Sequence, residues 1–478
     1  MSSSLRIHLL WILVFVVGVA LRFVNLSVPP MHADEAVGAK ITATRLEGNG
    51  YSFDPSHFHG PALSWITARI AGFAGKSSFT DLDALGLRSI AAACGSLVVL
   101  LPLLLRRWLG APGALVGGLI LATSPLLCVY SRVFIHEPLL VFFSAIALGC
   151  LGWWMHVKSP LAALCGGLAL GLMAATKETF AITAFSWMLG LLAIWPQIRG
   201  RRLAFATACA LGAFLAILLI AYGNPLHFFS TYFVYTTDPA HAKPVLYYWD
   251  LVIAPKHRPP QWWTEAGVAM FAAVGAWSGW RRANPFVRVL TVSTVVQFGV
   301  YSAISYKTPW LMMVPWMQVC LLAGVGAAAM WPRRFVGMAL VGVVVLFQLQ
   351  QTYAAVFRFP NDTRNPWVYA PTSTDVQRLH NRLESLKKQS PSFRGERIAV
   401  LGTGYWPLPW YLRETLEAGY FDAPPEDLES FAVVIAMPEM VSAADDRLSQ
   451  THEAFYYGLR NEMPMTVFIR NDVLEEDQ

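Results

Sequence analysis

The chain contains about eleven apolar runs of roughly 17–22 residues each, and these runs constrain its fold more than any other feature. A run of this length is long enough to cross a bilayer as an α-helix. Only 14% of the residues are charged and 55% are hydrophobic, whereas about a quarter of the residues of a soluble protein are charged. We therefore predict an α-helical polytopic membrane protein with about 11 transmembrane helices, centred near residues 15, 95, 120, 146, 168, 187, 212, 271, 295, 320 and 343.

The first apolar run has an arginine near its start, as a signal peptide does. The run is close to the length of a transmembrane helix, and no clear small-x-small cleavage site precedes the polar loop that follows it. We interpret it as a retained transmembrane helix.

Basic residues indicate the orientation of the helices, because loops rich in lysine and arginine stay in the cytoplasm. They cluster in alternate short loops, at Arg106-Arg107, Lys158, Arg199 with Arg201-Arg202, Arg281-Arg282 with Arg288, and Arg333-Arg334. This pattern places the N-terminus in the cytoplasm, and an odd number of helices then places the C-terminus outside. The sequence thus predicts a multi-pass protein of the cell (inner) membrane with an extracytoplasmic, periplasmic C-terminal domain.

From about Tyr353 the composition becomes that of a soluble domain. The pattern predicts an amphipathic helix over residues 375–388 and strands at 397–401, 431–437 and 466–470. Helices that alternate with strands are typical of an α/β domain. We predict a transmembrane domain over residues 1–352 and a soluble α/β domain over residues 353–478.

Several function classes are excluded by composition and spacing. The net charge of +6 comes from clusters at the ends of apolar runs, so we expect no nucleic acid partner. All six cysteines lie in apolar stretches without metal-ligand spacing, which argues against a disulfide framework or a zinc module. The Gly402-Thr403-Gly404 turn lacks a third glycine and a following helix, so we expect no nucleotide cofactor.

Two adjacent carboxylates, Asp34 and Glu35, follow the first apolar run within a few residues of the expected membrane boundary. Charge at this depth is costly to leave uncompensated and marks a candidate functional site. We predict that both are catalytic, with Asp34 as a general base that deprotonates an acceptor hydroxyl. The alternative is that the two acids occupy a hydrated loop and cap a helix that begins near Ala36.

The other candidate residues fall on the same predicted outer side. His136 and Glu137 could position an acceptor, hold a divalent metal ion, or pair with Arg132. His57 and His59 could add metal ligands or belong to a hydrated turn. Lys177 and Glu178 form either part of the site or a simple ion pair at a hairpin tip.

Lys307 is a lone cation in an otherwise apolar outer turn, with Tyr306 beside it. A lysine in this place can neutralise a lipid phosphate as the phosphate accumulates charge. We predict that Lys307, Arg132 and Tyr306 bind a donor phosphate. The alternative is a lysine that extends to the interface from the end of a helix. A further loop, residues 223–263, is rich in aromatic and basic side chains and serves either as an interface anchor or as a sugar-binding wall.

Taken in order, these motifs resemble the GT-C membrane glycosyltransferases, which include dolichyl-phosphate-mannose protein mannosyltransferases and the aminoarabinose transferase. The closest resemblance is to the branch of flippase activity-associated proteins of archaeal-type glycosylation. The motifs that carry it are His32-Ala33-Asp34-Glu35-Ala36, Tyr51-Ser52-Phe53-Asp54-Pro55, His59-Gly60-Pro61, Arg132 with His136-Glu137-Pro138, Tyr306-Lys307-Thr308-Pro309-Trp310, and Tyr405-Trp406-Pro407-Leu408-Pro409-Trp410-Tyr411-Leu412-Arg413.

The resemblance implies a GT-C fold and a sugar donor linked to polyprenyl phosphate. It also implies an inverting transfer with Asp34 as the base and a phosphate-binding role for Lys307. The acceptor stays open among a glycan, a lipid and a protein. Membrane lipids are expected partners. Two rival functions are a transporter or flippase-associated protein for lipid-linked sugars without covalent chemistry, and an assembly scaffold whose C-terminal domain recruits partners.

Overall fold

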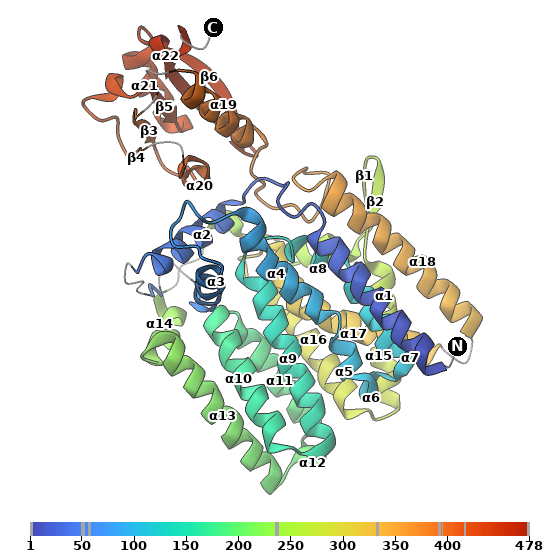
Figure 1. Ribbon diagram of the computed structural model, residues 1–478. Coiled ribbons are helices and arrows are strands. Elements are labelled where there is room, and N and C mark those ends of the chain that lie inside the picture. The colour runs from blue at the N-terminus through green and yellow to red at the C-terminus, as the bar shows by residue number, and fades with distance from the viewer. Residues whose placement is uncertain are drawn as a thin grey trace. The chain divides into compact units, whose positions relative to one another are not determined.

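The computed structural model describes residues 3–48, 53–55, 59–234, 239–330, 334–390, 393, 395–414 and 417–475. Most of these residues are helical (Figure 1). Contacts divide the chain into two compact units. The first unit comprises Met1–Leu26, Ser52–Thr67 and Arg88–Tyr369, and the second comprises Ser27–Tyr51, Ala68–Leu87 and Ala370–Gln478.

The first unit is a bundle of apolar helices joined by short turns. Its elements are α1 (Ser3–Phe23), most of α4 (Ala84–Val98), α5 (Leu101–Leu104), α6 (Arg106–Leu109), α7 (Ala111–Thr123), α8 (Pro125–Tyr130), α9 (His136–Val157), α10 (Pro160–Thr176), α11 (Phe180–Ala193), α12 (Trp195–Ile198), α13 (Arg201–Tyr222), α14 (Leu226–Val234), η1 (Pro239–His241), η2 (Trp249–Ile253), β1 (Lys256–Arg258), β2 (Gln261–Trp263), α15 (Ala266–Arg281), α16 (Pro285–Ala303), η3 (Pro309–Met312), α17 (Met313–Ala329), α18 (Arg334–Tyr353) and η5 (Ala354–Arg358). Helix α3 (Ala62–Phe73) begins in this unit and continues into the second.

Seven helices among the described residues are long and apolar enough to cross a membrane. They are Leu5–Phe23, Ala84–Leu104, His136–Val157, Arg201–Tyr222, Pro285–Ala303, Pro309–Ala329 and Phe335–Arg358, and three shorter apolar helices are Ala111–Thr123, Pro160–Thr176 and Phe180–Ala193. The predicted run near residue 271 forms α15, which has 16 residues. The prediction of a polytopic α-helical membrane protein is confirmed, although fewer helices have full spanning length than the eleven runs suggested. One reason is local: α7 ends at Thr123, because Pro125 starts a separate helix after the C-cap residue Ser124.

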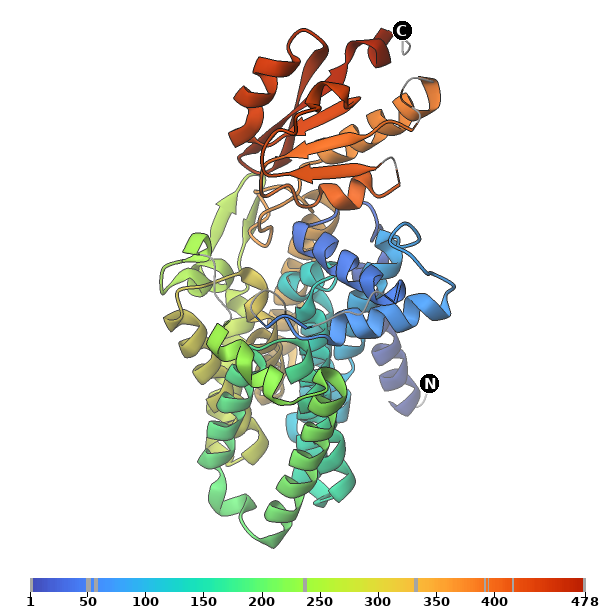
Figure 2. The same ribbon diagram turned by 90° about the vertical axis from the view of Figure 1, so that its left-hand side faces the viewer.

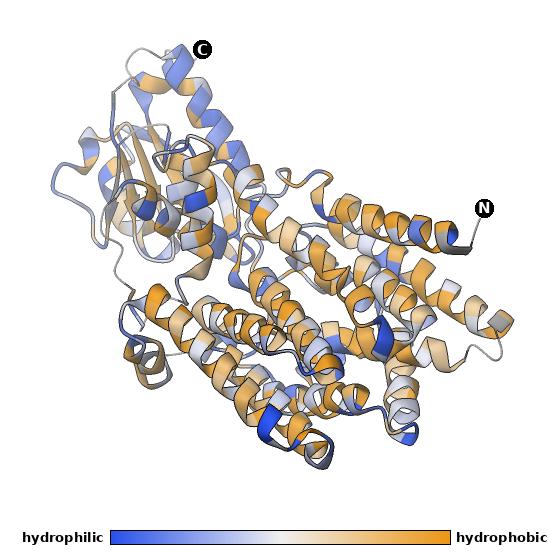
Figure 3. Cartoon of the chain, turned by 60° about the horizontal axis from the view of Figure 1, so that its bottom comes forward, coloured by the Kyte–Doolittle hydropathy of each residue, from blue (hydrophilic) through white to orange (hydrophobic). Residues whose placement is uncertain are grey.

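Helix α17 lies at the centre of the bundle, and nearly all of its residues are buried. Glycines let its neighbours approach closely. A Cβ atom at Gly326 would lie only 1.9 Å from the carbonyl oxygen of Phe271 in α15, and one at Gly324 would lie 2.3 Å from that of Gly113 in α7. Small residues at such crossings allow the backbone contact that drives association of helices in lipid. Figure 3 shows hydrophobic residues along the lengths of these helices.

The C-terminal part of the second unit is an α/β domain. Its five-stranded sheet has the order β4-β3-β5-β7-β6, with β3 parallel to β4 and β5, and with the other pairs antiparallel. Figure 2 shows these strands, coloured orange to red, lying side by side. The elements are α19 (Asp375–Gln389), β3 (Ile398–Leu401), α20 (Leu408–Leu412), β4 (Ala418–Phe421), η7 (Leu428–Ser430), β5 (Val433–Ala436), η8 (Pro438–Met440), α21 (Val441–Leu448), β6 (His452–Arg460), β7 (Met463–Arg470) and α22 (Asn471–Glu475).

The predicted α/β character of this region is confirmed. The three predicted strands correspond to β3, β5 and β7, whose side chains are nearly all buried. Strands β4 and β6 were not predicted, and both are partly exposed, whereas every residue of β3 and β5 is buried. The division at residues 352 and 353 stays a prediction. In the structure Ala370–Gln478 groups with two N-terminal segments, Ser27–Tyr51 and Ala68–Leu87.

Candidate active site

Asp34 and Glu35 lie in the first turn of α2 (Ala33–Leu46), where they have different environments. His32 is the N-cap, and the Asp34 N–H donates to its Nδ1 at 3.1 Å. The Glu35 carboxylate accepts a hydrogen bond from the His32 N–H at 2.8 Å, which completes a capping box. Glu35 is 1% exposed, whereas the Asp34 side chain is 55% exposed. Glu35 therefore caps its own helix, whereas the Asp34 carboxylate is accessible to solvent.

Lys177 and Glu137 form a buried ion pair in the first unit. Lys177 follows the end of α10 and Glu137 lies in the first turn of α9. The Lys177 Nζ lies 2.5 Å from the Glu137 Oε1, and each side chain is 4% exposed. Burial disfavours the ammonium, but the carboxylates of Glu137 and Glu178 outweigh it and raise the pKa of Lys177. Lys177 thus pairs with a distant carboxylate rather than with its chain neighbour.

Glu178 pairs with His59. The His59 Nδ1 lies 2.9 Å from the Glu178 Oε2, and the His59 ring packs edge-on against the His136 ring with centroids 5.0 Å apart. Burial raises the pKa of Glu178, but the charge and hydrogen bond of His59 and the charge of Lys177 outweigh it and lower the pKa from 4.5 to about 2. The two predicted pairs, His136-Glu137 and Lys177-Glu178, are therefore joined by interactions that cross between them.

Gly60 allows this arrangement, because it packs directly against the end of α10. A Cβ atom at Gly60 would lie 2.2 Å from the carbonyl oxygen of Ala175 and 2.9 Å from the Tyr222 hydroxyl. A side chain of any size would push His59 away from Glu178. Gly60 belongs to the His59-Gly60-Pro61 motif, but only the tertiary structure shows its close contact with Ala175.

Lys307 lies in a buried turn between α16 and η3, and it is 1% exposed. Its Nζ donates to the carbonyl oxygens of Ile304 and, at 3.1 Å, of Lys243. No carboxylate pairs with this ammonium among the described residues. Burial lowers the pKa of Lys307, because desolvation disfavours the charged form. An anion that reached this ammonium would replace lost hydration and bind favourably.

Aromatic side chains extend from the Lys307 turn to the end of α8. Trp310 packs edge-on against Tyr130, with ring centroids 5.6 Å apart, and against Tyr369 at 5.2 Å. Tyr306 packs on His241 at 5.3 Å. The first unit thus joins His59, His136, Glu137, Lys177 and Glu178 by direct contacts. Tyr306, which precedes Lys307, interacts electrostatically with Lys177 of this network. Asp34 and Glu35 belong to the second unit, and His57 lies outside the described residues.

Arg132 is 6% exposed, and it binds the end of α1 rather than a carboxylate. Its guanidinium donates to four carbonyl oxygens at 2.8–3.3 Å, those of Leu21, Arg22, Val24 and Asn25. The carbonyls of Leu21 and Arg22 are among those that a helix leaves unpaired at its C-terminus, and Val24 and Asn25 follow the helix directly. Arg132 does not contact Glu137 or Lys307 through any of these bonds, so its predicted role at a phosphate stays a prediction.

The described residues contain no group of three or more histidine, cysteine, aspartate or glutamate side chains that could hold a metal ion. His136 faces His59, while an oxygen of Glu137 is held by the Lys177 ammonium. The predicted ligands His136 and Glu137 therefore have different partners, and the described residues around them do not form a metal centre.

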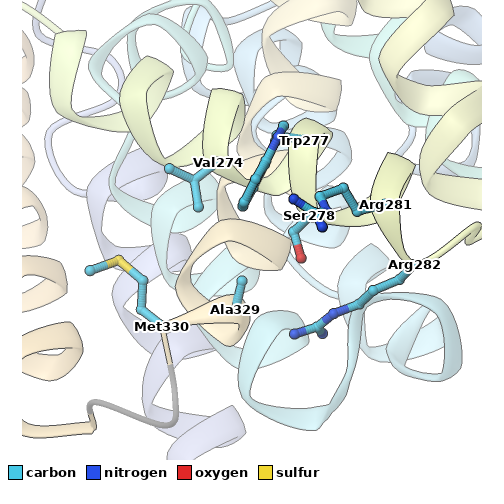
Figure 4. A pocket seen from close by; sticks show the side chains of 7 residues that line it. All are labelled: Val274, Trp277, Ser278, Arg281, Arg282, Ala329 and Met330. Atoms are coloured by element: carbon cyan, nitrogen blue, oxygen red, sulfur yellow. The ribbon is translucent and has the colours of Figure 1, made fainter.

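Two pockets of the first unit lie away from these residues. One, of about 480 Å³, is lined by Arg281, Arg282 and Trp277 at the ends of α15 and α17 opposite to Lys307 (Figure 4). The other, of about 270 Å³, is an apolar space between α9, α10, α11 and α13. Neither includes a predicted site residue.

Sequence reasoning missed Glu265, which is 1% exposed at the start of α15. Its carboxylate accepts hydrogen bonds from the Ser124 hydroxyl at 3.0 Å, the Trp316 indole at 3.1 Å and the Gln348 amide at 2.8 Å. The signal was a single carboxylate at the edge of a long apolar run. Arg22 and Arg88 are also buried charged residues of apolar runs, and the sequence could have identified them in the same way.

A family model described as dolichyl-phosphate-mannose-protein mannosyltransferase matches residues 12–230. No curated protein sequence matches the chain. Among solved structures, ArnT from Cupriavidus metallidurans bound to undecaprenyl phosphate is 16% identical with a TM-score of 0.64, over 97% of this chain and 98% of that chain. An oligosaccharyltransferase from Archaeoglobus fulgidus in the apo form is 13% identical with a TM-score of 0.56, over 95% of this chain and 74% of that chain.

A second structure of the archaeal enzyme, AglB in complex with an inhibitory peptide and a dolichol-phosphate, is 12% identical with a TM-score of 0.53, over 94% of this chain and 72% of that chain. At these identities the likeness concerns the fold. It extends over nearly the whole chain, the C-terminal α/β domain included.

Proposed function

We propose that this chain, whose fold is that of the GT-C membrane glycosyltransferases, transfers a sugar from a polyprenyl-phosphate donor to an acceptor hydroxyl on the extracytoplasmic side of the membrane. The observation that carries the proposal is the buried ammonium of Lys307, which binds carbonyl oxygens and has no carboxylate partner among the described residues. A buried cation of this kind suits the phosphate of a lipid donor. The complexes of ArnT with undecaprenyl phosphate and of AglB with dolichol-phosphate support a donor of this class.

The proposed transfer proceeds with inversion at the anomeric carbon. The Asp34 carboxylate takes the proton from the acceptor hydroxyl, and the acceptor oxygen attacks the anomeric carbon. The bond from that carbon to the phosphate oxygen breaks, and its electron pair leaves with the polyprenyl phosphate. Lys307 stabilises the charge that accumulates on the leaving phosphate, with Tyr306 and Arg132 as further candidate contacts. The exposed Asp34 side chain supports its role as the base.

The network of His59, His136, Glu137, Lys177 and Glu178 supports a site for the acceptor in this proposal. It holds charged groups of both signs in fixed positions at the ends of α9 and α10. Side chains that lock one another in this way keep a substrate in reacting geometry. No step is assigned to a metal ion.

Two substitutions test the proposal in the purified, reconstituted protein with a polyprenyl-phosphate-linked sugar as donor. We expect Asp34→Asn to lower kcat by about 10²–10⁴-fold, the usual contribution of a general base. Lys307→Met should raise the KM for the donor. Asp446→Asn and Lys388→Met, at exposed positions of the C-terminal domain, are the matched controls.

Full activity of a folded Asp34→Asn variant would refute the assignment of the base. Release of free polyprenyl phosphate separates transfer from transport, because a transporter moves the donor without cleaving it. A wild-type protein that moves the donor across vesicle membranes without this release would favour the rival function.

A further inference from the structure

The segment that leads into α2 is bound on both sides by the C-terminal α/β domain. The Met31 N–H donates to the Tyr411 hydroxyl at 2.8 Å, and the Met31 carbonyl accepts from the Thr372 hydroxyl at 2.7 Å. Met31 and Thr372 are each 2% exposed, and Tyr411 is 8% exposed. Both main-chain polar groups of one residue, three positions before Asp34, are therefore satisfied by side chains more than 340 residues away in the sequence.

Further contacts within the second unit join its N-terminal segments to the C-terminal α/β domain. Gln377 donates to the carbonyl oxygen of Val28 at 3.3 Å, and Arg413 donates to that of Leu82 at 3.3 Å. The Arg413 guanidinium lies over the Trp410 ring, 3.8 Å from its centroid, and Trp410 packs edge-on against Phe79. The N-terminal segments of the second unit thus form part of the C-terminal assembly.

The hydrogen bonds of the capping box link the position of Met31 to that of the Asp34 carboxylate. His32 follows Met31 directly, and its ring nitrogen and N–H fix the backbone at Asp34 and the side chain of Glu35. A displacement of Met31 would therefore be passed to Asp34 over one turn of backbone. A reacting group that moves by about 1 Å can lose about 10²-fold in rate.

Arg460 brings a charge from the same domain toward Asp34. Its backbone pairs with that of Thr372 in an isolated bridge, and its guanidinium donates to the Gly404 carbonyl oxygen at 2.6 Å. Burial lowers the pKa of Arg460, and the negative charge of Asp34 partly offsets this effect. Thr372, which binds Met31, and Arg460, whose charge interacts with Asp34, are thus neighbours across one isolated β-bridge.

We propose that the C-terminal domain is part of the catalytic apparatus, in which Thr372 and Tyr411 are positioning residues that hold Met31 and through it the Asp34 carboxylate. This inference rests on the proposed function, because it assumes that Asp34 acts in the reaction. It assigns the domain a role in catalysis, in place of the recruitment of partners that a scaffold would perform.

The test is the double variant Thr372→Val, Tyr411→Phe in the full-length protein. These changes keep the shapes of both side chains and remove only the two hydroxyls. We expect kcat to fall by about tenfold or more while the KM for the donor stays within about twofold, since the binding cation is not altered. Hydrogen exchange of a peptide over residues 28–36 should become faster. The matched control is Thr374→Val, Tyr456→Phe, in which Thr374 makes no capping hydrogen bond and Tyr456 is 81% exposed.

The two proposals fail in different ways. If Asp34→Asn is inactive while the double variant keeps the kcat and the exchange rate of the wild type, the positioning role is overturned. If Asp34→Asn is fully active, the proposed function fails, and the exchange measurement alone then decides whether the grip on residues 28–36 exists. If the double variant does not fold, Tyr411→Phe alone replaces it, with the same expected outcomes.

Discussion

The ammonium of Lys177 and the carboxylate of Glu137 lie 2.5 Å apart, and both side chains are almost completely buried. The two residues lie 40 positions apart in the sequence, Glu137 in the first turn of α9 and Lys177 directly after α10. Because the pair is shielded from solvent, each charge depends on the other, and either one alone would be left buried and uncompensated. This relationship leads to the first prediction.

Lys177→Met is expected to destabilise the protein by about 3–5 kcal/mol, the usual cost when one partner of a buried ion pair is removed. The double variant Lys177→Met, Glu137→Gln should recover most of this loss, because no buried charge remains. Thermal unfolding in detergent measures both. Lys76→Met, which removes one partner of the exposed pair Lys76–Asp83, serves as the control and should change stability little. Losses that simply add in the double variant would argue against the pair.

We expect the free energy of unfolding to decrease in acid, because Glu178 becomes protonated. Its pKa is lowered from 4.5 to about 2 in the folded state, chiefly by His59 and Lys177 acting against burial. A carboxyl group with a lowered folded pKa stabilises the protein above its unfolded pKa, and this stabilisation is lost as the pH falls from about 4.5 toward 2. Unfolding measured between pH 5 and pH 3 should show the loss in the wild type. Glu178→Gln should lose less stability over this range, and an identical slope in both proteins would contradict the assignment.

Gly60→Ala is expected to disrupt the contact between His59 and Glu178, because the new Cβ would overlap the backbone of Ala175. Backbone cannot yield as a flexible side chain can, so we expect a loss of about 1–3 kcal/mol and a weaker acid dependence than in the wild type. Gly212→Ala in α13 is the control, since a Cβ atom there meets nothing within 4 Å. It should be neutral or stabilising, because alanine favours a helix more than glycine does. Unfolding of the two variants under the same conditions decides the prediction.

Lys307→Arg should impair donor binding nearly as much as Lys307→Met, even though it keeps the charge. The ammonium of Lys307 occupies a buried turn, where the carbonyl oxygens of Ile304 and Lys243 surround a compact cation. A planar guanidinium is larger and needs a different arrangement of acceptors. The KM for the donor measures the effect. A Lys307→Arg variant with the KM of the wild type would show that only the charge matters.

The sequence was informative about elements whose pattern is local. Apolar runs identified nearly every helix of the bundle, and buried strands such as Ile398–Leu401 carry their signal in four successive apolar residues. Strand β6 (His452–Arg460) contains Phe455, Tyr456 and Tyr457, which favour strands, but it is mostly half-exposed and was not predicted. Its pairing with β7 forms the edge of the sheet. The resemblance to the flippase activity-associated branch stays a prediction, while the GT-C fold is confirmed by likeness to ArnT over nearly the whole chain.

For the candidate site, chemistry-bearing residues could be identified from their positions at the ends of apolar runs, but their partners could not. Lys177 is followed by Glu178 in the sequence, yet it pairs with Glu137, while Glu178 pairs with His59. Arg132 looked like a phosphate ligand, and the structure has it binding the carbonyl oxygens at the end of α1. Glu265 was not predicted because its partners come from distant parts of the chain: Ser124 between α7 and α8, Trp316 in α17 and Gln348 in α18.

The sequence by itself determined that this chain crosses a membrane many times and ends in an α/β domain, because hydrophobic length and periodicity act within single segments. Only the tertiary structure decided which charges meet and that the C-terminal domain holds the Met31 backbone ahead of Asp34. Such pairings depend on how helices cross and strands register, and the free energy that selects them is shared among residues that are hundreds of positions apart.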